Sequence, residues 1–284
     1  MAIRLIALDI DGTLLDSASE VPQVNRLAIE AAVERGIEVA LVTGRRFDFA
    51  LPIALQIPCP LTMIVNNGAV VKSKDGISHL RHLLPHQTAR EVLRLMHPYR
   101  RGAAVVFDRV RANQVIYEEI NWEDPRRKAY YLRNREFIAQ VCPLEQCLTE
   151  DPIQVMYSGS VEEIREAHAA LRAAPAILEF SVALTVYEHR DFSMLDVIRL
   201  NCSKGATLAE WAARRGYARE EVMAIGDNFN DREMLEFAGL PIVMGNSVPE
   251  LKALGWRETL SNDEGGVAAA IQEHALDVID PART

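Results

Sequence analysis

The chain has 284 residues, of which 49% are hydrophobic and 25% are charged, and this is enough apolar material for a sizeable core. At this length one large domain and two moderate domains are equally plausible. The formal net charge of -9 argues against a nucleic-acid partner, because phosphate backbones are bound by clustered Lys and Arg side chains.

Two further features bear on the location of the protein. No apolar run is long enough to cross a bilayer, and the first apolar stretch, residues 3–8, is too short for a signal peptide. The cysteines show neither a zinc-binding spacing nor a C-x-x-C pair, which fits free thiols in a reducing compartment. We therefore expect a cytoplasmic protein with no membrane partner. The cysteines are Cys59, Cys142, Cys147 and Cys202.

The N-terminal part of the chain alternates strands with helices. Residues 3–10 are almost continuously apolar, which is typical of a strand buried on both faces of a parallel sheet. Further strands are predicted at residues 37–43 and 61–65, and helices at residues 24–35 and 47–55. This alternation predicts βαβ units and a parallel sheet.

The pattern changes after residue 70. A Lys-Asp-Gly turn at residues 74–76 predicts a β-hairpin over residues 70–80. Residues 84–188 then mix helices, at residues 88–96 and 161–172, with short strands that follow one another without a helix between them. Those strands are predicted at residues 103–107, 115–117, 154–157, 178–182 and 184–187.

The alternating pattern returns in the last part of the chain. Helices are predicted at residues 203–215, 232–237 and 267–275, and strands at residues 222–225 and 241–244.

The fold class predicted from these patterns is α/β. Both ends of the chain, residues 1–83 and 190–284, would form one Rossmann-like core with a parallel sheet. Residues 84–189 would form a second, inserted α+β domain.

Polar residues follow four of the predicted core strands. In an open parallel sheet, ligands gather outside the carboxyl ends of the strands, so these groups are candidates for one site. They are Asp9 with Asp11, Thr43 with Gly44 and Arg45, Asn66 with Asn67, and residues 227–231.

Asp9 and Asp11 belong to the sequence DIDGT at residues 9–13. Residues two apart in an extended chain point the same way, and Gly12 lets the backbone turn sharply. A polar strand end with an Asx-turn explains this sequence equally well. A carboxylate directly after a buried strand is costly without a partner, which favours a metal ion. An EF-hand calcium loop is excluded, because Leu14 stands where that loop requires glycine.

Two other elements present groups that suit a phosphate. Thr43 and Gly44 offer a hydroxyl and a backbone N–H at a strand end, although a simple turn is the commoner explanation of Thr-Gly. Lys204 follows Ser203, a good N-cap, and therefore lies in the first turn of a helix. A cation there opposes the helix dipole, so a lysine directed at an anion explains the position better than a solvated one.

Residues 226–231 have the sequence GDNFND and are the most specific segment. A buried strand leads into two carboxylates and two amides just before a helix, whereas a helix cap needs only one such side chain. A hard cation such as Mg²⁺ takes oxygen ligands of this kind.

In this order, D-x-D-G-T, T-G-R, a lysine and G-D-x-x-N-D resemble the haloacid dehalogenase-like (HAD-like) hydrolase superfamily. Residues 67–69, 203–205, 244–246 and 264–267 further resemble its Cof-type phosphatases. Members of that group carry a type IIB α/β cap domain between the second and third motifs, where the inserted domain falls. The approach to the lysine through residues 201 and 202 departs from the usual glycine-containing form.

The resemblance implies a magnesium-dependent phosphatase that hydrolyses small phosphate monoesters, such as a sugar phosphate or another phosphorylated metabolite. An aspartyl-phosphate would form on Asp9, and Asp11 would act as general acid and then as general base. Asp9, the backbone carbonyl of Asp11 and Asp227 would hold Mg²⁺. The remaining implied roles are phosphate binding by Gly12, Thr43, Gly44, Lys204 and Asn230, and support of the metal and the lysine by Asn230 and Asp231.

The sequence leaves several alternatives open. Arg45 and Asn67 are candidates to contact the substrate, but for Arg45 a structural salt bridge is equally plausible. A phosphomutase is the main rival, and a receiver-type signalling domain or a non-catalytic binding protein is less well supported. The sequence identifies neither the substrate nor the oligomeric state. In the inserted domain it does not choose among Arg109, Tyr117, Trp122 and His189.

Overall fold

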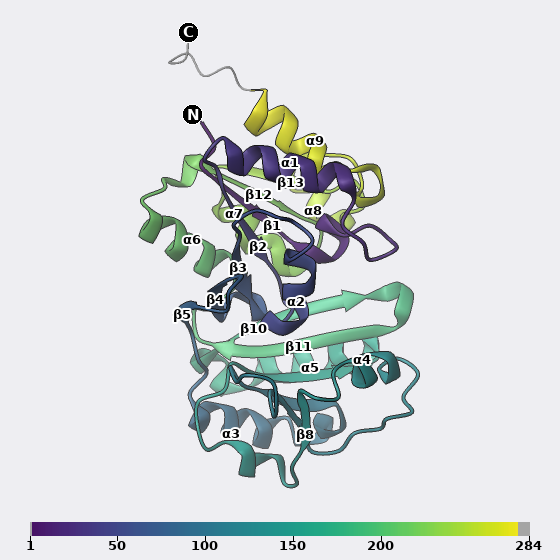
Figure 1. Cartoon of the computed structure of the whole chain (residues 1–284). Helices are drawn as coiled ribbons and strands as arrows, with labels where there is room; N and C mark the ends of the chain where they lie inside the picture. Colours follow the sequence, from purple (N-terminus) through teal and green to yellow (C-terminus); the bar gives the residue numbers. More distant parts are fainter. Residues whose placement is uncertain (1, 278–284) are drawn as a thin grey trace. The chain divides into compact units, whose positions relative to one another are not determined.

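A computed structural model describes residues 2–277 of the chain, without the side chains of Ile177 and His189. The chain forms two compact units (Figure 1). Unit 1 combines Met1–Arg81 with Ser203–Thr284, and unit 2 consists of His82–Cys202.

Unit 1 is built on an eight-stranded sheet with the order β14-β13-β12-β1-β2-β3-β4-β5. Neighbouring strands from β14 to β3 run parallel, and β4 and β5 extend the sheet as an antiparallel hairpin. The predicted α/β fold with its parallel sheet is therefore confirmed. The strands are β1 (Leu5–Leu8), β2 (Glu38–Val42), β3 (Thr62–Val65), β4 (Val70–Ser73), β5 (Ser78–Arg81), β12 (Val222–Gly226), β13 (Leu240–Val243) and β14 (Arg257–Glu258).

The helices of unit 1 bury the central strands. β1 is completely buried, as its apolar run predicts. The first and last helices of the unit, α1 and α9, lie side by side although they come from opposite ends of the chain (Figure 1). A second pair of helices, α6 and α7, pack against each other. Both contribute apolar side chains to a cluster with β1, β2 and β12. The helices are α1 (Gln23–Glu34), α2 (Phe47–Ala54), α6 (Lys204–Arg215), α7 (Arg232–Phe237), α8 (Pro249–Lys252) and α9 (Gly266–Ile271).

Unit 2 has its own six-stranded sheet, with the order β10-β11-β9-β6-β7-β8. Strands and helices share one apolar core, in which α3 and α5 pack against β9. Its strands are β6 (Ala103–Val106), β7 (Val115–Tyr117), β8 (Ile138–Gln140), β9 (Gln154–Gly159), β10 (Phe180–Tyr187) and β11 (Phe192–Arg199). Its helices are α3 (His86–Leu95), α4 (Lys128–Arg133) and α5 (Val161–Ala173).

Two sequence predictions for this region differ from the structure. The two strands predicted at residues 178–182 and 184–187 are one continuous strand, β10. The boundary predicted between residues 189 and 190 falls before β11, which pairs with both β10 and β9 and so belongs to unit 2. The inserted unit therefore ends at Cys202.

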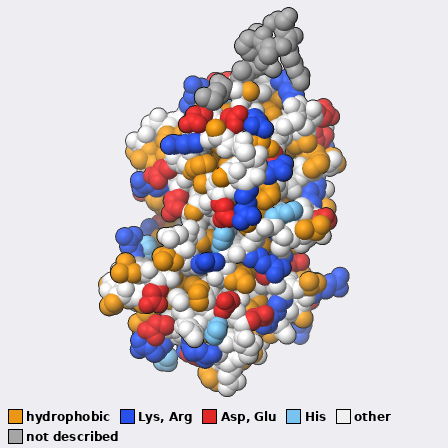
Figure 2. Space-filling view, turned by 90° about the vertical axis from the view of Figure 1, so that its left-hand side faces the viewer, with side chains coloured by type: hydrophobic (Ala, Val, Ile, Leu, Met, Phe, Trp, Pro, Cys, Tyr) orange, Lys and Arg blue, Asp and Glu red, His pale blue; other side chains and the backbone are white. Residues whose placement is uncertain are grey.

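Charged side chains of both signs are interspersed over the face shown in Figure 2. Within residues 2–277, no helix has the length and apolar character needed to cross a membrane.

Candidate active site

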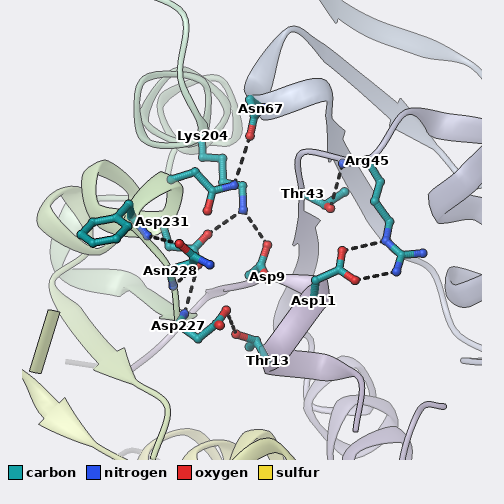
Figure 3. Close-up of polar contacts among 12 residues, drawn as sticks. Asp9, Asp11, Thr13, Thr43, Arg45, Asn67, Lys204, Asp227, Asn228 and Asp231 are labelled. Carbon is teal, nitrogen blue, oxygen red and sulfur yellow. Dashed lines mark hydrogen bonds and ion pairs between the residues drawn. The ribbon is translucent and has the colours of Figure 1, made fainter. Parts of the chain in front are cut away.

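The candidate site lies at the carboxyl end of β1, in unit 1. β1 is flanked by β2 and β12, so the loops that follow these three parallel strands meet at one edge of the sheet. Asp9 follows β1, Thr43 follows β2 and Asp227 follows β12. The N–H of Asp9 donates to the carbonyl of Ile225 over 3.0 Å, which ties the first loop to β12. Figure 3 shows the resulting cluster of polar side chains.

Asp9 is paired with Lys204 in the interior of unit 1. Lys204 Nζ lies 2.5 Å from Asp9 Oδ1 and 2.6 Å from Asp231 Oδ1, and none of the three residues is more than 4% exposed. Burial raises the pKa of Asp9 to about 7, and the charge of Asp231 adds to this, whereas Lys204 opposes it. Burial would lower the pKa of Lys204, but Asp231 and Asp9 outweigh burial and the pKa of Lys204 is raised. Lys204 is therefore a fixed ammonium between two carboxyl groups.

The start of α6 explains how a lysine reaches this position. Ser203 is the N-cap, and its hydroxyl accepts a hydrogen bond from the N–H of Ala206 over 3.0 Å. Gly205 follows Lys204, and a Cβ there would lie 2.4 Å from the backbone of Glu233 in α7. Glycine thus lets α6 approach α7 closely enough to bring Lys204 to the end of β1.

Asp231 is held so that it supports Lys204. One of its carboxylate oxygens accepts from Lys204, and the other accepts the backbone N–H groups of Asp227 and Asn228 over 3.0 and 3.1 Å. Both oxygens of Asp231 are therefore engaged within the protein. Its predicted support of the metal and the lysine stays a prediction.

Asp9, Asp227 and Asp231 form the acidic part of the site. They offer carboxylate oxygens that all lie within 4.8 Å of one another. Burial raises the pKa of Asp227 well above its ordinary value, and the charges of Asp9 and Asp231 raise it further. Three carboxyl groups beside one ammonium leave excess negative charge in a buried site, and oxygen ligands of this kind suit Mg²⁺. The residues present therefore fit a divalent cation.

Gly12 shapes the loop that carries Asp9 and Asp11. Its φ of +82° belongs to the left-handed region, and a Cβ there would lie 2.4 Å from Asp227 Oδ2. The side chain of Asn246 donates to the carbonyl of Gly12 over 2.8 Å. A side chain at position 12 would displace the carboxylate of Asp227 in the loop after β12, so the structure gives Gly12 a positioning role. Its predicted contact with phosphate stays a prediction.

The predicted phosphate-binding residues Thr43, Gly44 and Asn230 lie in loops joined by Asn67, the candidate substrate contact. The hydroxyl of Thr43 accepts from the N–H of Arg45 over 3.1 Å, and the carbonyl of Thr43 accepts from the N–H of Asn67 over 3.0 Å. Gly44 packs against Asn67, whose side-chain oxygen accepts from Asn230 Nδ2 over 3.3 Å. The structure thus brings these residues together, while their contacts with phosphate or substrate remain predictions.

Arg45 forms a salt bridge with Asp11. Arg45 Nε lies 2.7 Å from Asp11 Oδ2, and Nη2 lies 2.5 Å from Oδ1. Figure 3 shows the Asp11 carboxylate directed toward this guanidinium and away from the pair of Asp9 and Lys204. The salt-bridge alternative for Arg45 is therefore the one present in the structure.

Comparisons with known proteins show the family of this chain. The family model described as "haloacid dehalogenase-like hydrolase" matches residues 6–271. The chain belongs to the haloacid dehalogenase-like hydrolase family. It is 31% identical over 254 residues to the HMP-PP phosphatase of Serratia proteamaculans, covering 88% of this chain and 87% of that protein. It is 27% identical to the 5-amino-6-(5-phospho-D-ribitylamino)uracil phosphatase YitU of Bacillus subtilis, over 95% of this chain and 97% of that one.

A solved structure supports the fold of this family. A haloacid dehalogenase-like hydrolase from B. subtilis superposes with a TM-score of 0.80 at 23% identity, covering 95% of this chain and 99% of that chain. At this level of identity the comparison establishes the fold alone. The family match over residues 6–271 is what confirms the resemblance read from the motifs.

Two residues of this haloacid dehalogenase-like site received no role from sequence reasoning. Thr13 donates its hydroxyl to Asp227 Oδ1 over 3.2 Å and so links the loop after β1 to the loop after β12. Asn246 holds the Gly12 carbonyl and also accepts from the N–H of Asn262 over 2.9 Å. Both belong to motifs noted in the sequence, but only the folded loops show which groups they bind.

The candidates in unit 2 have partners within that unit. Arg109 pairs with Glu150 and lies 4.0 Å over the ring of Phe107. Tyr117 is buried and accepts a hydrogen bond from Arg127 over 2.7 Å. Trp122 packs edge-on against Tyr131. The side chain of His189 lies outside what the structure describes.

Proposed function

We propose that this haloacid dehalogenase-like hydrolase is a Mg²⁺-dependent phosphatase that acts on small phosphate monoesters through an aspartyl-phosphate on Asp9. The observation that carries the proposal is the buried Asp9 carboxylate, held by Lys204 within an acidic cluster at the end of β1. Phosphoryl transfer asks a protein mainly for positioning and for neutralisation of charge, and this cluster supports both.

In the first step an oxygen of Asp9 attacks the phosphorus of the ester. The bond between phosphorus and the leaving oxygen breaks, and Asp11 donates a proton to that oxygen. Lys204 hydrogen-bonds one oxygen of Asp9 and so fixes the direction in which the other points. The ammonium also offsets the negative charge of the incoming phosphoryl group.

In the second step water attacks the phosphorus of the aspartyl-phosphate. Asp11 takes a proton from this water, inorganic phosphate leaves and the Asp9 carboxylate is restored. Thr43, Gly44 and Lys204 are proposed to bind the phosphoryl oxygens. Their loops are held by the hydrogen bond from Asn67 to Thr43 and by the N-cap of α6.

Asp9, the backbone carbonyl of Asp11 and Asp227 are the residues that would hold Mg²⁺. When bound, Mg²⁺ supplies positive charge that lets the anionic ester approach the Asp9 carboxylate. Asp231 stays with Lys204 and with the backbone amides of the β12 loop, so it acts by holding these groups in place.

Unit 2 is proposed to serve as the cap that selects the substrate. The two relatives above are named as phosphatases of different compounds, which supports a small phosphorylated metabolite as the substrate class. A cytoplasmic location is part of the proposal and is supported by the free thiols of all four cysteines.

Phosphate release tests this function. The purified chain with Mg²⁺ is incubated with p-nitrophenyl phosphate and then with a panel of sugar phosphates, nucleotides and phosphorylated cofactors. We expect inorganic phosphate from wild type and none from Asp9→Asn. Transfer of the phosphoryl group to an added sugar phosphate in place of water would show a phosphomutase. The absence of turnover of every ester would contradict the proposal.

A further inference from the structure

Arg45 binds both oxygens of the Asp11 carboxylate. Nε and Nη2 of one guanidinium donate to Oδ2 and Oδ1 over 2.7 and 2.5 Å. A planar fork of this kind fixes the plane of the carboxylate as well as its distance. The side chains of Arg45 and Asp11 are 21% and 33% exposed, so the pair is partly shielded from water.

Arg45 is itself held by the loop that follows β2. Its N–H donates to the hydroxyl of Thr43 over 3.1 Å, and its carbonyl accepts from the N–H of Asn66 over 2.9 Å. Its guanidinium lies 4.9 Å over the ring of Phe49, in the first turn of α2. The guanidinium is therefore a fixed element against which Asp11 is aligned.

We propose that Arg45 is a positioning residue for Asp11 and acts on the leaving group through Asp11, not through its own contact with the substrate. This inference rests on the proposed function, in which Asp11 gives its proton to the leaving oxygen as the bond to phosphorus breaks. Asp11 sits in the turn at Gly12, on a short side chain that can rotate about its own bonds. The paired guanidinium limits that rotation to one orientation. When Asp11 is protonated for the first step, one carboxyl oxygen carries the proton for the leaving group and Arg45 holds the other oxygen.

The dependence on the leaving group separates the two roles of Arg45. An alkyl phosphate releases a strongly basic alkoxide that needs a proton from Asp11, whereas p-nitrophenyl phosphate releases an anion that leaves without one. For Arg45→Met we expect kcat/KM to fall by roughly 10²-fold with the alkyl ester, since misplacement of a catalytic group by about 1 Å has such an effect. With the aryl ester we expect a loss of less than about 5-fold, because general acid catalysis contributes little there.

Two further variants sharpen this test. Arg45→Lys keeps the charge but loses the fork, so we expect a loss between those of wild type and Arg45→Met. In an Asp11→Asn background, Arg45→Met should cause no additional loss with the alkyl ester, because a residue that acts through Asp11 has nothing left to position. Arg26→Gln is the matched control, since Arg26 pairs with Glu30 over 3.7 Å on α1 and should leave both substrates unaffected.

The outcomes are distinct. Equal losses of kcat/KM with both esters, or additive losses in the double variant, would show that Arg45 contacts the substrate and would overturn the inference. Unchanged activity of Arg45→Met would overturn it as well. Thermal unfolding of each variant identifies any loss of activity that comes from misfolding. If Arg45→Met misfolds, Arg45→Lys is compared with wild type in its place. If wild type itself releases no phosphate from either ester, the proposed function has failed, and this result is separate from all the others.

Discussion

Replacing Lys204 by Met removes an ammonium from the interior of unit 1 and keeps most of the length of the side chain. Asp9 Oδ1 and Asp231 Oδ1 then lose the donor that lies 2.5 and 2.6 Å away. Removing one partner of a buried ion pair typically costs about 3–5 kcal/mol, because the remaining charge is left uncompensated. We expect a loss of stability of this size, since Lys204 is only 1% exposed and serves two carboxylates.

The loss should depend on pH in a defined direction. Burial and Asp231 raise the pKa of Asp9 from 3.8 to about 7 in the folded protein, and the pKa of Asp227 is also raised. A carboxyl group with a raised folded pKa contributes stability below its unfolded pKa and loses it as the pH rises through the folded value. Lys204 opposes this effect. The stability difference between wild type and Lys204→Met should therefore grow between about pH 4 and pH 8.

Denaturant unfolding followed by circular dichroism at about pH 5 and pH 8 measures this difference. Lys252→Met is the matched control, because Lys252 pairs with Glu258 in the same unit while its side chain remains 32% exposed. We expect that change to lower the free energy of unfolding by less than about 1 kcal/mol. The double variant Lys204→Met/Asp231→Asn should regain part of the lost stability and no activity. If Lys204→Met lost no more unfolding free energy than the control, or lost the same amount at both pH values, the explanation by an uncompensated buried charge would be refuted.

Three other predictions follow from the same site. Asp9→Asn should abolish turnover and retain at least the thermal stability of wild type, because Lys204 keeps its pair with Asp231 while one of three neighbouring buried acidic groups is removed. A melting temperature well below that of wild type would contradict this. Gly12→Ala should lower kcat/KM by roughly 10²-fold and the free energy of unfolding by about 1–3 kcal/mol. The reason is that the added Cβ would lie 2.4 Å from Asp227 Oδ2, at a residue with a positive φ. Unchanged kinetics would contradict this prediction. Chelation of Mg²⁺ should stop turnover. Added Mg²⁺ should raise the melting temperature more at about pH 8 than at about pH 5, because the raised pKa of Asp9 lets protons compete with the cation at the lower pH. Calorimetry that shows the reverse order would count against Asp9 as a ligand.

Much of the core could be predicted from local patterns. The apolar run before Asp9 identifies a strand buried on both faces, and β1 is completely buried. Ser203 marks the start of α6, and this places Lys204 in its first turn. Because parallel strands end at one edge of a sheet, the motifs after β1, β2 and β12 were expected to meet there.

The end of the inserted unit could not be predicted in the same way. β11 contains Ser193 and Asp196, polar residues that interrupt the apolar pattern of a buried strand. Asp196 is buried because it accepts a hydrogen bond from Gln154 of β9 over 2.6 Å. The partner of Asp196 lies 42 positions away, so the sequence offers no local sign that this carboxylate is satisfied inside a sheet.

The role of Arg45 could not be predicted for the same reason, because its partner is far away in the sequence. The T-G-R pattern places an arginine at the site, but its partner Asp11 is 34 positions away in the chain. Whether such a side chain pairs with the protein or with a substrate depends on the direction of the two loops. Only the folded structure shows that the Asp11 carboxylate points to Arg45 (Figure 3).

Trapping the covalent intermediate tests the central claim, that Asp9 accepts the phosphoryl group. An aspartyl-phosphate is an acyl phosphate, and borohydride reduces it to homoserine, whereas a free carboxylate does not react. The enzyme is mixed with Mg²⁺ and excess p-nitrophenyl phosphate, quenched during turnover, treated with borohydride and digested for mass spectrometry. We predict homoserine at position 9 in wild type and no conversion in Asp9→Asn. Turnover with position 9 unmodified and another side chain reduced in its place would contradict the account.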